Sequence, residues 1–174
     1  PPAPAPPPPP PPASVEERIA RIHERIGRES AEFRARYVDA LDMSWIYHDS
    51  ALEGVVYSYQ ELRAALDAST VVVVDEESSL QPVVEEVRRH KAAIEFTRDH
   101  AKKKLPVTLD VVKKIYLILR PEEGDLKTLK YRRDIPQHRL YFHDYAQPDK
   151  IPVKARQVID WLNDPETKKG RNTI

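Results

Sequence analysis

The chain has 174 residues, and its 28 basic and 28 acidic side chains leave it with no formal net charge. That balance argues against a general nucleic-acid binder, which usually has a basic surplus. The mean hydropathy of -0.61 and the lack of any apolar run of about 20 residues argue against a membrane partner. No cysteine is present, which excludes disulfides and thiolate metal sites and fits a reducing compartment, so we expect a soluble, cytoplasmic protein.

Residues 1–13 are a proline-rich tail. Proline fixes φ and has no backbone N–H, so this tail is expected to be an extended, solvated polyproline II segment without a core. Two roles are open for it. It is either a semi-rigid linker to an upstream domain or a ligand for a proline-binding module.

Residues 14–43 are expected to form an N-terminal helical segment. Ser14 and Glu17 make a capping box at its start. The segment is either one long helix or two helices with a bend near Gly27. Apolar residues then recur at helical spacing, at Val15, Ile19, Ile22, Ile26, Phe33, Tyr37, Leu41 and Trp45.

Capping signals predict three further helices. Gly54 suits the left-handed position after a helix end, and Ser58 opens a short helix that runs to Leu66. Residues 70–79, "TVVVVDEESS", are predicted to be an extended connection or a short strand. Ser79 and Thr108 are expected to cap the next two helices, whose inward residues are Leu80, Val83, Val84, Val87 and Ile94 in one and Val111, Ile115 and Ile118 in the other.

The C-terminal part combines a β element with a last helix. Within residues 130–152, Tyr141 and His143 alternate with Phe142 between turn residues, which predicts a β-hairpin or flap. Residues 153–164, "VKARQVIDWLND", are predicted to be a helix. The predicted fold class is therefore mainly α with one small β element.

Motifs of common chemistry are missing from the sequence. There is no G-x-x-x-x-G-K-S/T phosphate loop and no G-x-S-x-G elbow. None of the six histidines forms an H-E-x-x-H or comparable ligand pair, so no metal site is predicted.

Several segments nevertheless occur in a familiar order: "SALEG", "SYQEL", "VEEVRRHKAAIEF", "LPVTLDVVKKIYLIL", "KYRRDIP" and "IPVKARQVIDWLND". The last three loosely follow P-L-T-x-x-x-I-x-x-L-H-x-x-L, G-x-Y-R-x-x-x-V with Leu129 in place of the glycine, and P-x-x-V-P-x-x-M-x-x-L-x-x-W-L-N. Together they resemble the Fic (Fido-domain) family over residues 44–163. Residues 44–174 are therefore interpreted as the N-terminal portion of an incomplete Fic-like helical bundle with a hairpin flap.

The resemblance implies a function. Fic domains mostly transfer AMP from Mg-ATP to a protein hydroxyl, through a catalytic loop H-P-F-x-x-G-N-G-R that this chain does not contain. The chain alone is therefore expected to be inactive, with ATP and Mg bound only together with the missing catalytic half. It would be the regulatory and target-binding portion of a Fic-type protein. The alternatives are a catalytically degenerate Fic-like interaction module and a helical interaction domain unrelated to the family.

The resemblance also places an inhibitory site. Many family members have an inhibitory helix, S/T-x-x-x-E-G/N, whose glutamate pairs with an arginine of the catalytic loop. Glu53 and Gly54 match its last two positions. Asp49 occupies the first position and Ser50 is next to it. The expected inhibitory residues are Glu53, Gly54, Asp49 and Ser50.

The flap gives a second expected site. Family members hold the target protein by adding a strand at this flap, which here comprises Arg139, Leu140, Tyr141, Phe142 and His143. Alternatively, Leu140 and Phe142 simply pack the hairpin down. Without catalytic helices the bundle is expected to expose apolar faces, which favours association with another chain, including homo-oligomers.

Overall fold

The computed structural model describes residues 14–66, 80–136 and 144–169. Over these ranges the protein is all-helical, with no strand. The proline-rich tail, the predicted connection at residues 70–79 and the flap at residues 139–143 lie outside the described residues. The described helices are α1 (Val15–Arg28), α2 (Ala31–Leu52), α3 (Tyr59–Leu66), α4 (Leu80–Lys102), α5 (Leu109–Leu119), α6 (Ile151–Asn163) and α7 (Pro165–Lys169), with 3-10 turns at Pro121–Glu123 and Pro148–Lys150.

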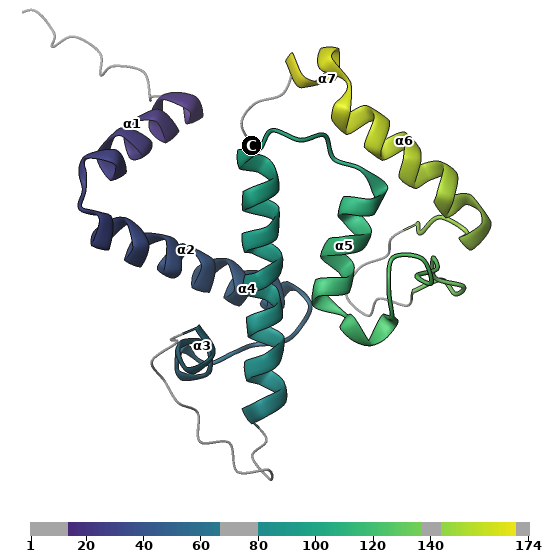
Figure 1. The fold of residues 1–174 in the computed structure, drawn as a ribbon, viewed down its shortest axis with the longest axis horizontal. Helices are drawn as coiled ribbons and strands as arrows, with labels where there is room; N and C mark the ends of the chain where they lie inside the picture. Colours follow the sequence, from purple (N-terminus) through teal and green to yellow (C-terminus); the bar gives the residue numbers. More distant parts are fainter. Residues whose placement is uncertain (1–13, 67–79, 137–143, 170–174) are drawn as a thin grey trace, which may run out of the picture.

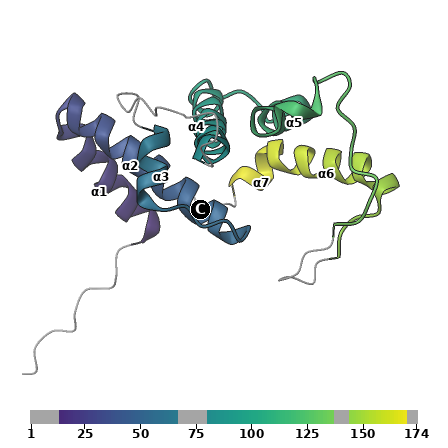
Figure 2. The same ribbon diagram turned by 90° about the horizontal axis from the view of Figure 1, so that it is seen from below.

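Helix α4 occupies the centre of the molecule (Figure 1). α2 and α3 pack on one side of it, and α5 packs on the other. α6 lies against α5 and continues into α7 (Figure 2). The long central helix therefore connects an N-terminal half, α1 to α3, with a second half, α5 to α7.

Of the two alternatives for the N-terminal segment, the structure shows two helices, with the bend just after Gly27. α1 ends at Arg28 because Glu29 adopts extended backbone angles, and the Ser30 hydroxyl then accepts a hydrogen bond from the Phe33 N–H at 3.1 Å to start α2. Arg34 Nη1 donates to the Gly27 carbonyl at 3.3 Å across the bend. Two helices with their own caps form, instead of one long helix.

The capping signals in the sequence are confirmed at three helix starts. Ser14 and Ser58 each exchange two hydrogen bonds with the glutamate three residues later, as a capping box requires. The Thr108 hydroxyl accepts from the Val111 N–H at 3.2 Å. Helix α6 begins at Ile151, two residues before the predicted start, and the short α7 was not predicted.

The buried core lies where α2, α3 and α4 meet. Its buried apolar residues are Ile46, Tyr57, Leu62, Ala65, Val84 and Val87, with Val83 and Ile94 packed partly buried against them. This confirms the predicted inward stripe of α4 for the residues whose side chains are described. In α5 the predicted inward residues Val111, Ile115 and Ile118 are only half-buried.

The apolar residues that recur at helical spacing along α2 are not buried. Phe33, Tyr37, Leu41 and Trp45 are all exposed. α2 instead packs on α4 through the face that carries Asp42, Ile46 and Ser50, spaced by four residues. Hydrophobic spacing alone does not reveal which face of a helix meets its neighbour when buried polar residues, here Asp42 and Ser50, lie in the contact.

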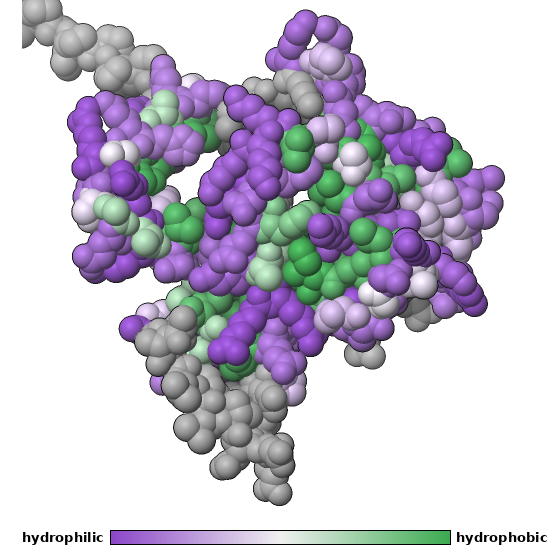
Figure 3. Space-filling model, viewed as in Figure 1, coloured by the Kyte–Doolittle hydropathy of each residue, from purple (hydrophilic) through white to green (hydrophobic). Residues whose placement is uncertain are grey.

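Large parts of the apolar surface stay uncovered. Among the described residues, seven hydrophobic side chains are buried, whereas nineteen large ones are exposed, including Val158 and Trp161 of α6. Hydrophobic residues gather between α4 and α5 on one face of the molecule (Figure 3). No helix among the described residues has the length and apolar character to cross a membrane.

Candidate functional site

The C-terminal end of α2 is built as a capped turn. The N–H groups of Glu53 and Val55 donate to the Ser50 carbonyl at 3.1 and 2.9 Å, and the Gly54 N–H donates to the Ala51 carbonyl at 3.1 Å. Gly54 has φ 84°, in the left-handed region that favours glycine. The turn reverses the chain and leaves Glu53 exposed at the helix end.

The structure separates Asp49 from Ser50. Ser50 is buried with 4% exposure on the face that meets α4. Asp49 is exposed and lines a groove of about 330 Å³ between α2, α4 and α5. Trp45, Ile46, His90 and Ile115 also line this α2–α4–α5 groove. Of the four expected inhibitory residues, Asp49 and Glu53 therefore offer carboxylates at the surface, whereas Ser50 belongs to the core.

Tyr57 anchors the chain after this turn. It is 4% exposed, and neither its hydroxyl nor that of Ser50 makes a hydrogen bond of good geometry within the described part of the chain. Burial raises the pKa of Tyr57, and the neighbouring Glu86 carboxylate on α4 raises it further. The ring is thus fixed by packing.

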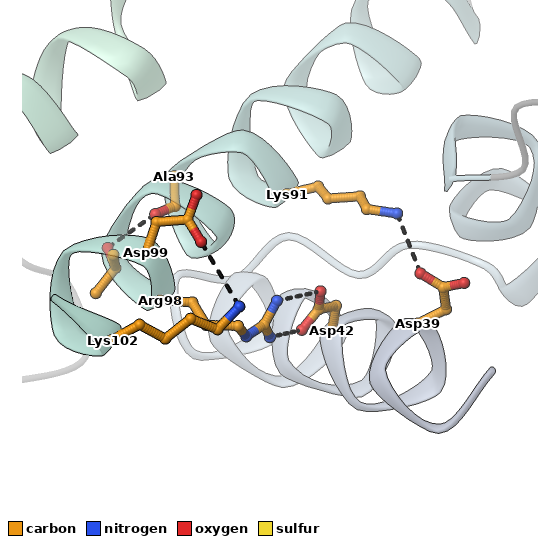
Figure 4. Close-up of polar contacts among 8 residues, drawn as sticks. Asp39, Asp42, Lys91, Ala93, Arg98, Asp99 and Lys102 are labelled. Carbon is orange, nitrogen blue, oxygen red and sulfur yellow. Dashed lines mark hydrogen bonds and ion pairs between the residues drawn. The ribbon is translucent and has the colours of Figure 1, made fainter. Parts of the chain in front are cut away.

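Two ion pairs hold α2 on α4 (Figure 4). Asp42, which is 2% exposed, receives two hydrogen bonds from the Arg98 guanidinium, with Nη1 at 3.1 Å from Oδ2. That contact raises the pKa of Arg98. Lys91 Nζ lies 3.2 Å from Asp39 Oδ1 one turn earlier on α2. The two pairs fix the rotation of α2, and so decide which of its residues face the α2–α4–α5 groove.

The flap residues Arg139 to His143 lie outside the described residues, but the segments on both sides of them are tied together. Arg132 donates from Nη1 to the Asp134 carbonyl at 2.7 Å and from Nη2 to the Ala146 carbonyl at 2.6 Å. Its guanidinium also lies 5.8 Å from the centre of the Tyr145 ring. One arginine therefore joins the beginning and end of the segment that contains the predicted flap.

The sequence interpretation missed Asp42, Arg98 and Arg132 as organising residues. Asp42 had a detectable signal, because it lies four residues before Ile46 and eight before Ser50 on one helical face. Its partner Arg98 had none, because the pairing joins residues 56 positions apart. Arg132 was noted within the Tyr-Arg motif, yet its carbonyl partners depend on a loop closure that local patterns do not specify.

Comparison with known proteins adds no relative. No protein-family model, curated protein or solved structure matches the chain. Within the described residues, no group of three acidic or histidine side chains is placed to hold a metal ion.

Proposed function

We propose that this protein is the regulatory and target-binding portion of a Fic-type protein that transfers AMP from ATP to a protein hydroxyl, and that this chain alone does not catalyse the transfer. The observation that carries the proposal is the end of α2. There a carboxylate residue and a left-handed glycine, Glu53 and Gly54, close a helix next to the open α2–α4–α5 groove. This helix end places the Glu53 carboxylate at the surface, where helices that carry the catalytic loop would contact it.

The exposed apolar surfaces of α5 and α6 support the proposal that further helices pack on this half of the protein. α5 and α6 bury none of their side chains fully, although both carry apolar stripes. Exposed apolar surface of this kind is typical of interaction sites. Under this proposal, helices bearing the catalytic loop cover that surface and hold ATP and Mg, in the cytoplasm.

Inhibition would follow from charge pairing at the end of α2. A glutamate shielded from water forms charge-assisted, bidentate hydrogen bonds with an arginine. The γ-phosphate of ATP competes for the same arginine. Pairing of Glu53 with that arginine therefore opposes productive ATP binding. Asp49, one turn earlier and exposed, adds a second carboxylate near the same place.

Target binding is proposed at the flap. The Arg132 contacts to Asp134 and Ala146 bring together the two backbone segments that enter and leave residues 137–143. A closed base of this kind suits a hairpin whose edge accepts an extended segment of the target protein.

Radiolabelled ATP tests the proposal. In a gene product that contains this chain and the downstream catalytic helices, Glu53→Gly should raise the transfer of α-phosphate label to protein above the unsubstituted level. Glu29→Gly is the matched control, because Glu29 is the C-cap of α1 as Glu53 is the C-cap of α2. No rise for Glu53→Gly, with an intact loop and a folded variant, contradicts the inhibitory role.

The second candidate is a catalytically degenerate Fic-like interaction module. The many exposed apolar side chains favour it, since they suit protein binding with or without catalysis. A downstream loop that lacks its histidine, together with no labelling in any variant, would select this module over the enzyme.

A further inference from the structure

A second groove lies between α2 and α3, and it is lined by none of the residues that line the α2–α4–α5 groove. It is open to solvent and has a volume of about 860 Å³. Tyr57 and Leu62, both buried, form part of its lining, together with Met43 and Tyr47. Tyr59, which is 63% exposed, also lines it. This α2–α3 groove is therefore mainly aromatic and apolar.

Two arginines border the α2–α3 groove, Arg36 from α2 and Arg63 from α3. Both are exposed. Arg36 makes no hydrogen bond or ion pair within the described part of the chain, and Arg63 donates only to the Tyr59 hydroxyl, at 3.3 Å. The guanidinium groups on the two walls are thus available to an incoming anion.

The carboxylates beside the groove are already engaged. Asp39 is paired with Lys91 of α4. Glu61 accepts a hydrogen bond from the Ser58 N–H at 2.6 Å, and this bond lowers the pKa of Glu61. The charge that a partner would meet at the edges of this apolar groove is therefore the positive charge of Arg36 and Arg63.

This combination points to a class of partner. Tyr, Met and Arg are enriched at the centres of protein interfaces, and Tyr and Arg are common among the residues that contribute most to binding. A groove between two helices accepts an amphipathic helix that inserts apolar anchors. Carboxylates beside those anchors would form charge-assisted hydrogen bonds with guanidinium groups. We propose that the α2–α3 groove binds an acidic amphipathic helix of another protein, with its apolar side chains on the tyrosines and its carboxylates on Arg36 and Arg63.

A second copy of α1 fits this groove less well. The apolar stripe of α1 is also uncovered, since none of its residues is buried. However, Arg18, Arg21 and Arg25 follow one edge of that stripe. In the groove they would bring like charges towards Arg36 and Arg63, which opposes association. The charge pattern therefore favours an acidic partner over self-association through α1.

Fluorescence anisotropy with two designed probes tests this inference, which is independent of AMP transfer. Both are labelled helical peptides of roughly 15 residues with leucine at i, i+3, i+4 and i+7. One carries glutamate at the flanking positions and the other lysine. The protein should bind the acidic peptide at least about tenfold more tightly than the basic one, and added salt should weaken that binding.

Variants assign the binding to the groove. The double substitution Arg36→Glu and Arg63→Glu should reverse the peptide preference, and Tyr59→Ala should weaken binding of the acidic peptide. Arg18→Glu, an equally exposed charge reversal on α1, should leave the affinity unchanged. Circular dichroism melting confirms that each variant is folded. No binding, equal affinity for both peptides, or an unchanged preference in the folded double variant would overturn the proposal.

Discussion

The side-chain amide of Asn163 pairs with both backbone polar groups of Val107. Its Oδ1 accepts from the Val107 N–H at 3.1 Å, and its Nδ2 donates to the Val107 carbonyl at 2.7 Å. Nδ2 also donates to the Ile159 carbonyl at 2.9 Å within α6. One side chain therefore joins the end of α6 to the segment before α5, in a part of the molecule that has no fully buried core residue.

Replacing Asn163 with alanine should destabilise the protein by about 1–3 kcal/mol, because it leaves two partly buried backbone groups of Val107 without a partner. Urea unfolding followed by circular dichroism measures the change. Gln157→Ala, at an exposed position of the same helix, is the control and should shift stability by less than about 0.5 kcal/mol. Equal effects of the two substitutions would show that the Asn163 contacts contribute nothing.

Breaking the Asp42–Arg98 pair should have a larger effect than breaking the Lys91–Asp39 pair. Arg98→Met leaves the Asp42 carboxylate, which is 2% exposed, without its cation, and we expect a loss of about 2 kcal/mol or more. Lys91→Met should cost below about 1 kcal/mol, because Asp39 is largely exposed. Thermal melting of both variants measures the two losses of stability. A larger loss for Lys91→Met than for Arg98→Met would contradict the expectation that burial of Asp42 sets the larger effect.

Tyr57 should make the protein sensitive to alkaline pH. Its pKa in the folded state is raised from 10.0 by burial, so the unfolded chain releases this proton first. The contribution of the protonated Tyr57 hydroxyl to the free energy of unfolding is fully present below about pH 10. It is lost as the pH rises through the folded-state pKa. Above about pH 10, the free energy of unfolding should fall less steeply with pH in Tyr57→Phe than in the unsubstituted protein. Denaturant titration at several pH values measures this difference. Tyr59→Phe, on the surface, is the control, and parallel pH profiles for Tyr57→Phe and the unsubstituted protein would refute the assignment.

The same substitution should have opposite signs at two glycines. A Cβ added at Gly54 or Gly27 meets no heavy atom within 4 Å, so sterics do not distinguish them. Gly54 has φ 84°, where alanine is strained by about 1–2 kcal/mol. Gly27 lies inside α1, where alanine is favoured by about 0.5–1 kcal/mol. The melting temperature should fall for Gly54→Ala and rise for Gly27→Ala, and a rise for both would argue against the left-handed turn after α2.

Local patterns were sufficient for several helix ends but insufficient for the arrangement of the site. Ser14, Ser58 and Thr108 predicted their helix starts because a cap depends on residues within three positions. The exposed end of α2 at Glu53 followed from Gly54 in the same way. The Fic-like function and the flap stay predictions.

The sequence by itself determined where α1, α3 and α5 begin and where α2 ends, because hydrogen bonds between residues near in the chain set those boundaries. Only the tertiary structure decided that α2 turns Asp42 and Ser50 inwards and Trp45 outwards. That choice depends on Arg98, 56 residues away, whose guanidinium makes burial of the Asp42 carboxylate tolerable. Likewise, only the packing of α3 beside α2 brings Arg36 and Arg63 to opposite walls of one groove.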